Sequence, residues 1–348
     1  MLTYWLIFLL PILTLFFPLH ASKSLQYTTW VLLGVLFSLF IGLRHQVGGD
    51  WNAYLNYYEF STVSSFDEIP LIFSDVGYGI LNWLSGLIDG KIYLVNFLCG
   101  TILIVGLFSF CREQPIPWLA LIIAIPYIVN VVTMGYTRQG VALGFAMLAL
   151  LALKKEQNYR FILWVIFATL FHKTAIILLP FAALVNTKNF LWILFWLILT
   201  FLTLYFLFFI DHANTLWTNY VENEMASEGG LIRVLMNVIP ASLLLIFRKK
   251  LIPKGYEYRL WIWIAIFSLI CLPLVFFAST AVDRIALYLL PIQVYVFSRI
   301  SFLFSSEATR VICIVFIVFY YSLIQWVWLN KATHAYAWLP YQFYPFIE

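Results

Sequence analysis

Charged residues are scarce in this sequence, and their scarcity excludes a water-soluble fold. Only 10% of the 348 residues are Asp, Glu, Lys or Arg, whereas an average soluble domain carries about 25%. Hydrophobic residues make up 64% of the chain, and the mean hydropathy is +0.94. So few charges cannot cover a surface that faces water, and much of the surface must therefore face lipid. We expect a polytopic integral membrane protein.

Cysteines are few, and nucleotide-binding motifs are absent. The four cysteines all lie within or at the edge of apolar segments: Cys99, Cys111, Cys271 and Cys313. Their spacing fits neither a metal site nor a disulfide framework, so we interpret them as small apolar packing residues. The sequence has no P-loop, dinucleotide fingerprint or Asp-x-Asp pair. We therefore expect no metal ion, no other cofactor and no nucleic acid partner.

Long apolar runs are the main positive feature, and they predict an all-α bundle. In hydrocarbon every backbone polar group must be paired internally, so such runs form helices. The runs cover residues 2–19, 27–43, 76–110, 116–134, 139–153, 160–171, 174–186, 190–210, 231–247, 259–279, 285–303 and 309–329. We expect about 12 transmembrane segments in a single domain, 1–348, with outward-facing loops at 44–75 and 211–230.

Two regions leave the number of spans open. The run 76–110 is too long for one straight span, and polar residues at 89–91 interrupt it, so we expect a short helix that leads into a longer one. The runs 160–171 and 174–186 are each too short for a full span and meet at His172. They form either two half-depth helices that meet at a polar apex or one helix with His172 near its middle.

Basic residues predict which side of the membrane each loop faces, because cytoplasmic loops carry an excess of Lys and Arg. If the loop with Lys154 and Lys155 is cytoplasmic, thirteen of the 20 basic residues lie inside, Lys188 among them, and both chain ends face the periplasm. Six basic residues lie outside, namely Arg44, Arg138, Lys173, Arg233, Arg284 and Lys331, and Lys91 is assigned to neither side. Ionisable groups at the membrane boundary are costly and commonly line a cavity or pathway. The alternative is that each arginine only extends to the lipid headgroups.

The outward cations suit a pyrophosphate ligand. A planar guanidinium can donate hydrogen bonds to two phosphate oxygens at once. Several such groups around one cavity balance the charge of a pyrophosphate. The predicted pyrophosphate-binding residues are therefore Arg44, Arg138 and Arg284, with Lys173 and Arg233 as second choices.

The segment that follows the second apolar run has the composition of a substrate-binding surface. Gly48 and Gly49 can bring backbone N–H groups close to a ligand. Trp51 and Tyr54 stand among amides and carboxylates, as in a carbohydrate-binding surface. Interfacial Trp and Tyr also form the ordinary aromatic belt of membrane proteins, and Tyr341 in the C-terminal tail carries the same ambiguity.

These residues lie in short motifs that resemble the EpsG-like branch of the Wzy-type O-antigen polymerases. In chain order the motifs are Arg44 with Val47-Gly48-Gly49-Asp50-Trp51 and Tyr54, Arg138-Gln139, His172 with Thr174-Ala175, Asp283-Arg284 with Tyr288, and Leu339-Pro340-Tyr341. The motifs are spread over most of the chain. Two departures stand out: the usual Gly-Thr-Asp-Tyr reads Gly48-Gly49-Asp50-Trp51, and Lys173 adds a cation next to His172.

The resemblance implies a glycosyltransferase of GT-C-like membrane architecture. Such proteins join oligosaccharide repeat units, carried on undecaprenyl pyrophosphate, at the periplasmic face of the bacterial inner membrane. The product would be an O-antigen, a capsule or an exopolysaccharide, and the partners would be membrane lipid, a flippase and a chain-length regulator. The alternative is a transporter or flippase for the same lipid-linked oligosaccharide, because it too needs a cationic cavity in the membrane.

For the polymerase we expect an inverting, metal-independent displacement. A hydroxyl of the incoming unit attacks the anomeric carbon of the growing chain, and cations stabilise the charge on the departing pyrophosphate. Asp50 and His172 are the candidate catalytic bases that accept the hydroxyl proton. Asp50 is preferred, because nearby cations keep a carboxylate ionised, and His172 would then orient the substrate. Gln139, Asp283 and Tyr288 complete the predicted substrate-binding residues.

Overall fold

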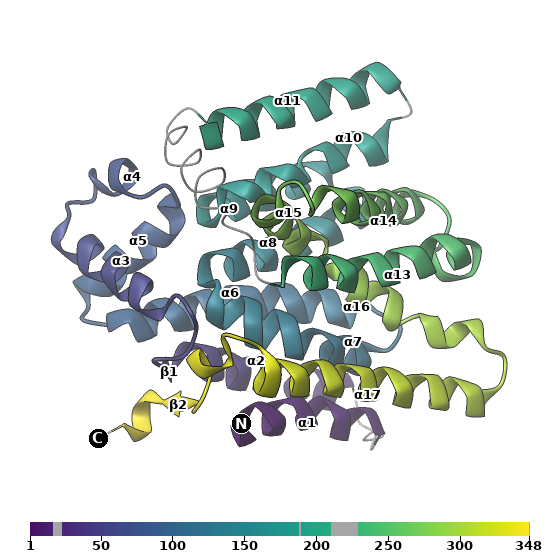
Figure 1. Ribbon diagram of the computed structural model, residues 1–348, viewed down its shortest axis with the longest axis horizontal. Helices are drawn as coiled ribbons and strands as arrows, with labels where there is room; N and C mark the ends of the chain where they lie inside the picture. Colours follow the sequence, from purple (N-terminus) through teal and green to yellow (C-terminus); the bar gives the residue numbers. More distant parts are fainter. Residues whose placement is uncertain (17–22, 188, 210–228, 348) are drawn as a thin grey trace.

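The computed structural model describes residues 1–16, 23–187, 189–209 and 229–347, which are almost entirely helical (Figure 1). The first half of the chain forms α1 (Leu2–Phe16), α2 (Lys23–Gly42), β1 (Arg44–His45), α3 (Trp51–Val63), α4 (Ile69–Ile72), α5 (Val76–Leu87), α6 (Lys91–Arg112), α7 (Pro117–Ala124), the π-helix η1 (Ile125–Thr133), α8 (Thr137–Lys154) and α9 (Asn158–Phe171). The second half forms η2 (Lys173–Leu178), α10 (Pro180–Asn186), α11 (Phe190–Phe209), α13 (Gly230–Leu251), α14 (Tyr256–Leu274), α15 (Ser279–Ala286), η4 (Leu287–Leu289), α16 (Pro291–Phe297), η5 (Ile300–Leu303), α17 (Glu307–Lys331), η6 (Ala335–Ala337), β2 (Gln342–Phe343) and η7 (Tyr344–Phe346). The prediction of an all-α fold is confirmed.

Six helices in the described part of the chain are long and apolar enough to cross a membrane: α2, α6, α8, α13, α14 and α17. The bent pair Ser279–Leu289 and Pro291–Leu303 makes a seventh if it is one span. Five shorter apolar helices accompany them: Leu2–Phe16, Pro117–Thr133, Asn158–Phe171, Lys173–Asn186 and Phe190–Thr200. The chain is thus a membrane protein, and its apolar runs are helical as predicted. The number of about 12 full spans stays a prediction.

The centre of the bundle is built from α6, α7, η1 and α8. All residues of α7 from Leu119 to Ala124 are buried, as is the whole of η1. Large apolar side chains of the outer helices are instead exposed, for example Leu32 of α2 and Phe316 of α17. In a membrane protein this outer apolar surface faces lipid.

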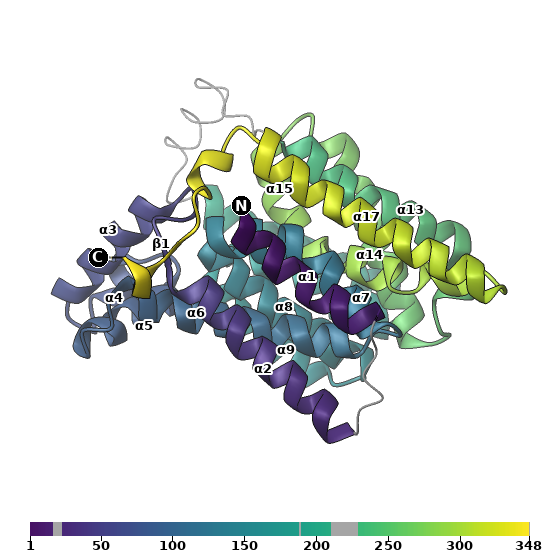
Figure 2. The same ribbon diagram turned by 90° about the horizontal axis from the view of Figure 1, so that it is seen from below.

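Helix α8 runs through the bundle with a basic residue near each end. Arg138 lies in its first turn and Lys154 in its last, roughly 24 Å away at about 1.5 Å per residue. We call these the Arg138 end and the Lys154 end of the bundle. Both chain termini and the group α3–α5 lie at the Arg138 end (Figures 1 and 2).

The segment 44–75 differs from the predicted loop, because β1, α3 and α4 form within it. Helix α3 is ordered by its aromatic side chains: Trp51 and Tyr54 are buried, and the Tyr54 ring packs edge-on against Tyr78 of α5 with centroids 5.4 Å apart. Burial of two large rings stabilises a helix that its sequence alone does not favour. The predicted loop 211–230 lies outside the described residues except for its last two, and so does Lys188.

The two ambiguous regions are both resolved. A short helix, α5, leads into the longer α6, and Asp89 and Lys91 take left-handed backbone conformations at the break, with φ of 52° and 54°. Helix α9 ends at Phe171, His172 is extended with φ of −158°, and η2 follows. His172 therefore stands at a break between two short helices, as in the first alternative.

Candidate active site at the Arg138 end

Asp75 is the centre of a polar cluster at the Arg138 end. It directly precedes α5 and is buried. Arg138 Nη1 donates a 2.6 Å hydrogen bond to Asp75 Oδ2, and His172 Nδ1 lies 3.6 Å from the same oxygen. Gln139 Nε2 lies 3.0 Å from His172 Nε2. The sequence analysis missed Asp75, which brings Arg138 and His172 to one carboxylate and, through His172, Gln139 as well.

The contact with Gln139 favours one tautomer of His172. The amide nitrogen of Gln139 can only donate, so His172 Nε2 accepts and Nδ1 carries the proton toward Asp75. In this arrangement the basic lone pair of the imidazole is occupied by Gln139. His172 is thus suited to orienting a neighbour and less suited to accepting a proton.

Aromatic rings hold the guanidinium of Arg138 from another side. Its central carbon lies 4.9 Å from the centroid of the Tyr57 ring and 6.0 Å from that of the Tyr54 ring. A cation over an aromatic face is attracted by the ring electrons. The Arg138 side chain nevertheless keeps 25% of its surface exposed. Arg138 is therefore fixed in place and still accessible to a second anion.

A second ion pair links α13 to α15. Arg233 donates from Nε and Nη2 to the two carboxylate oxygens of Asp283. Such a two-point pair is stronger and better oriented than a single hydrogen bond. Tyr136, just before α8, lies within electrostatic range of Arg233, Asp283 and Asp50. This pair therefore belongs to the same end of the bundle as Arg138.

The charged side chains at this end that have no hydrogen bond or ion-pair partner among the described residues include Asp50, Lys173 and Arg284. Asp50 precedes α3 and makes no side-chain capping bond. Partial burial raises the pKa of Asp50, and the positive charges of Arg138 and Arg284 oppose that shift. Asp50, Arg138 and Arg284 therefore face a common region, in which Arg138 is paired with Asp75 and the Asp50 carboxylate and the Arg284 guanidinium have no direct partner among the described residues.

Arg44 does not belong to that region. It is fully buried, and its guanidinium donates to Val47 O (3.1 Å), Ile41 O (2.6 Å), Asn96 Oδ1 (3.2 Å) and Thr137 Oγ1 (2.9 Å). All these acceptors are neutral groups of the protein. The predicted pyrophosphate contact at Arg44 does not fit this geometry, because four hydrogen bonds use its donors to tie α2 to α6 and α8.

Tyr288 and Tyr341 were predicted as substrate-binding residues, and both hydroxyl groups bond within the protein. Tyr288 is buried, and Thr174 Oγ1 donates to its hydroxyl at 3.2 Å. Tyr341 donates to Phe40 O at 2.6 Å. Both are thereby placed as packing residues in this structure.

The Gly48-Gly49 segment also differs from its predicted use. Gly48 N–H donates to Ala337 O at 2.8 Å, so this backbone donor is occupied by the C-terminal tail. Gly49 is exposed, whereas Trp51 and Tyr54 are buried side chains. Of this predicted group, Gly49 and the adjacent Asp50 carboxylate remain accessible to a substrate.

The residue types at this end are suited to binding an oxyanion. Within the described residues, no group of three or more His, Cys, Asp or Glu is placed to hold a metal ion. The cations Arg138, Lys173 and Arg284 are the groups that could neutralise a phosphate, and Asp50 could accept a proton.

Comparisons with known proteins agree with the motif positions. A family model described as the EpsG family matches residues 27–343, nearly the whole chain. The match extends over every motif noted above, from Arg44 to Tyr341. No curated protein and no solved structure gave a match.

Proposed function

Because the chain belongs to the EpsG family, whose members resemble Wzy-type polymerases, we propose that it polymerises oligosaccharide repeat units linked to undecaprenyl pyrophosphate. The family supports a role in polysaccharide biosynthesis as a glycosyltransferase-like enzyme. The observation that carries the finer proposal is the grouping of Asp50, Lys173 and Arg284. These charged side chains have no direct partner among the described residues, and they lie at one end of an apolar helical bundle.

The charge balance of the site favours a pyrophosphate. Asp75 and Asp283 each pair with one arginine, so those arginines add little net charge. Lys173 and Arg284 add positive charge that no carboxylate in the described part of the chain pairs with directly. A lipid-linked pyrophosphate would supply the missing negative charge, and preorganised cations would stabilise it as it departs.

The proposed reaction is an inverting displacement. A hydroxyl oxygen of the incoming unit forms a bond to the anomeric carbon of the growing chain, and the bond from that carbon to the pyrophosphate oxygen breaks. Asp50 accepts the hydroxyl proton, and Arg284, Lys173 and Arg138 take up the charge of the pyrophosphate leaving group. His172, held by Gln139 and Asp75, orients the bound substrate.

The basic residues support an orientation in the membrane. The Lys154 end carries Lys154 and Lys155, and the exposed Arg248, Lys249 and Lys250 end α13. An excess of exposed basic residues is typical of the cytoplasmic side. We therefore place the Arg138 end at the periplasmic face of the inner membrane, where lipid-linked repeat units are joined.

Deletion of the gene, followed by gel analysis of the surface polysaccharide, tests this function. Loss of the long-chain ladder, with single repeat units still displayed, is the expected result. Loss of all surface sugar, with lipid-linked units retained on the cytoplasmic side, would overturn the proposal in favour of a flippase. Complementation with Arg284→Ala should fail, whereas Lys249→Ala, which removes an exposed cation at the Lys154 end, should restore the ladder.

A further inference from the structure

The chain after α17 crosses back over the Arg138 end (Figure 2). We call residues 332–347 the C-terminal strap. Its outer part is fixed to the end of α2: β2 pairs antiparallel with β1, and Tyr344 N donates to Leu43 O at 2.8 Å. The Tyr344 ring stacks on Tyr93 of α6 with centroids 3.7 Å apart. The strap is therefore anchored along its length and not a loose tail.

Trp338 is the most buried part of the strap, at 2% exposure. Its indole Nε1 donates to Asn130 O of the π-helix η1 at 2.7 Å, and its own carbonyl accepts from Tyr4 of α1 at 2.9 Å. Its ring also packs edge-on against Trp328 of α17. The side chain and the carbonyl group of this one residue thus join three helices that are far apart in the sequence.

The strap touches both segments that lead into the candidate site. Trp338 lies so close to Gly135 that a Cβ there would come within 2.7 Å of the indole ring. Ala337 O accepts from Gly48, whose φ of +111° and approach to Met134 O leave no room for a side chain. Gly48 lies two residues before Asp50, and Gly135 lies three residues before Arg138.

We propose that Trp338 is a positioning residue that sets the spacing between Asp50 and Arg138. Asp50 has no capping bond of its own, so the placement of its carboxylate depends on how residues 46–50 are held. The strap holds that segment through Ala337 and holds the start of α8 through the contact with Gly135. The link to catalysis rests on the proposed function, whereas the link to the two segments rests on the contacts alone.

Hydrogen exchange of the full-length protein in lipid nanodiscs tests whether Trp338 holds these two segments, and it needs no assay of activity. Trp338→Ala should raise amide exchange in peptides covering 44–52 and 134–140 at least tenfold, while peptides at the Lys154 end stay unchanged. The matched control is Trp261→Phe: Trp261 is a buried tryptophan of α14 whose Nε1 has no partner among the described residues. Unchanged exchange in both site peptides of Trp338→Ala would overturn the proposal.

A double-mutant cycle keeps the test valid if Trp338→Ala fails to insert. Gly135→Ala pushes a methyl group into the indole ring, and Trp338→Phe removes the part of the ring nearest to it. If the two residues act through this contact, the double variant should lose less activity and less protection than the two single effects combined. Simple additivity would contradict the proposed contact.

Transfer kinetics with purified lipid-linked oligosaccharide test the link to catalysis. Trp338→Ala should lower kcat at least tenfold with little change in KM, and Trp338→Phe should recover part of the loss. Faster exchange with unchanged kcat would overturn the positioning role. Faster exchange in a protein whose wild type shows no transfer would instead overturn the proposed function and leave the strap contacts established.

Discussion

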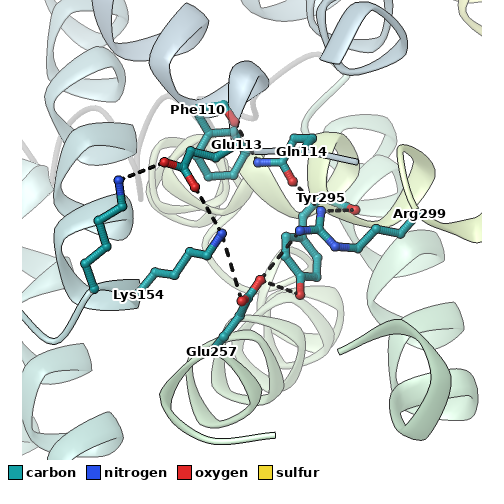
Figure 3. A network of polar contacts seen from close by, with 8 residues as sticks. Phe110, Glu113, Gln114, Lys154, Glu257, Tyr295 and Arg299 are labelled. Carbon is teal, nitrogen blue, oxygen red and sulfur yellow. Dashed lines mark hydrogen bonds and ion pairs between the residues drawn. The ribbon is translucent and has the colours of Figure 1, made fainter. Parts of the chain in front are cut away.

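The two ends of α8 carry polar clusters of similar composition, but the clusters differ in whether their charged side chains have partners. At the Lys154 end, Lys154 and Lys155 pair with Glu113, and Arg299 lies 3.5 Å from Glu257 (Figure 3). At the Arg138 end, Asp50 and Arg284 have no such partner among the described residues.

The Lys154 cluster is completed by neutral groups. Arg299 is 8% exposed, stacks on the Tyr295 ring with its central carbon 3.6 Å from the centroid, and donates to the side chain of Gln114. Tyr295 in turn donates to Glu257 at 2.9 Å (Figure 3). Buried charges that are paired and hydrogen-bonded in this way hold helices together. The comparison teaches that the buried cluster at the Lys154 end is satisfied within itself, whereas the Arg138 end has, beside its two ion pairs, Asp50 and Arg284 without a partner among the described residues. We propose that a ligand binds there.

Replacing Arg284 should lower activity strongly. Loss of a preorganised charge on the leaving group costs about 10²–10³-fold in rate, so Arg284→Ala should abolish the long-chain ladder while the protein still inserts. Arg284→Lys should retain part of the activity. A normal ladder from a well-expressed Arg284→Ala variant would contradict the proposal that the Arg138 end binds the ligand through its unpaired charges.

Asp50→Asn should lower the transfer rate by about 10²–10⁴-fold, the usual contribution of a general base. Burial raises the pKa of Asp50, and a base must be ionised, so wild-type activity should fall as the pH drops through a value above the ordinary range of an aspartate. The residual activity of Asp50→Asn should lack this acidic limb in a rate–pH profile. An identical acidic limb in the variant would reassign the base.

Asp75→Asn should lower activity about tenfold, because Arg138 and His172 both lose their anionic partner. It should also lower the free energy of unfolding by about 1–3 kcal/mol, since a buried hydrogen bond to a charged group is weakened. Thermal unfolding in detergent, measured beside the transfer rate, checks both effects. A stability loss with full activity would make Asp75 purely structural.

Arg299→Ala should lower the stability of the protein without lowering its activity. It leaves Glu257 and Gln114 without their buried partner, which should cost about 2–4 kcal/mol. The polysaccharide ladder of the surviving protein should be normal. Shortened chains at unchanged protein levels would show that the Lys154 end also contributes to polymerisation.

Glu113→Gln should have the smallest effect, a loss of about 0.2–1 kcal/mol, because the pair is about one-third exposed. The hydrogen bond from Lys155 lowers the pKa of Glu113. The stabilisation is therefore present at neutral pH and is lost as the pH falls through the lowered value. Unfolding of wild type and variant at two pH values should show the difference only at the higher one.

The sequence was informative where a local pattern decides the structure. Apolar runs form helices because the backbone has no alternative in hydrocarbon, and the polar residues at 89–91 and at His172 break them for the same reason. The outward basic residues indicated which end of the bundle carries the candidate site, because Arg138, Lys173 and Arg284 come from separate short motifs and lie at the same end.

The sequence was uninformative where a partner comes from a distant segment. Asp75 looks like an ordinary acidic residue before a helix, and its role is visible only once α8 and the break at His172 are placed beside it. Arg44 has the position of an exposed helix-end cation. Its burial depends on Asn96 and Thr137, which lie 52 and 93 residues away in the chain.

The π-helix η1 has a consequence for the length of the chain between α7 and α8. A π-helix holds one residue more per stretch than an α-helix would, and such segments recur at functional sites. Deleting a single residue from 125–133 would let the segment become α-helical, so that the positions inside it would be spaced differently around the helix axis. Asn130 would then no longer meet the indole of Trp338. Function should therefore depend on the number of residues in this stretch. A one-residue insertion or deletion here should be far more harmful than most point substitutions.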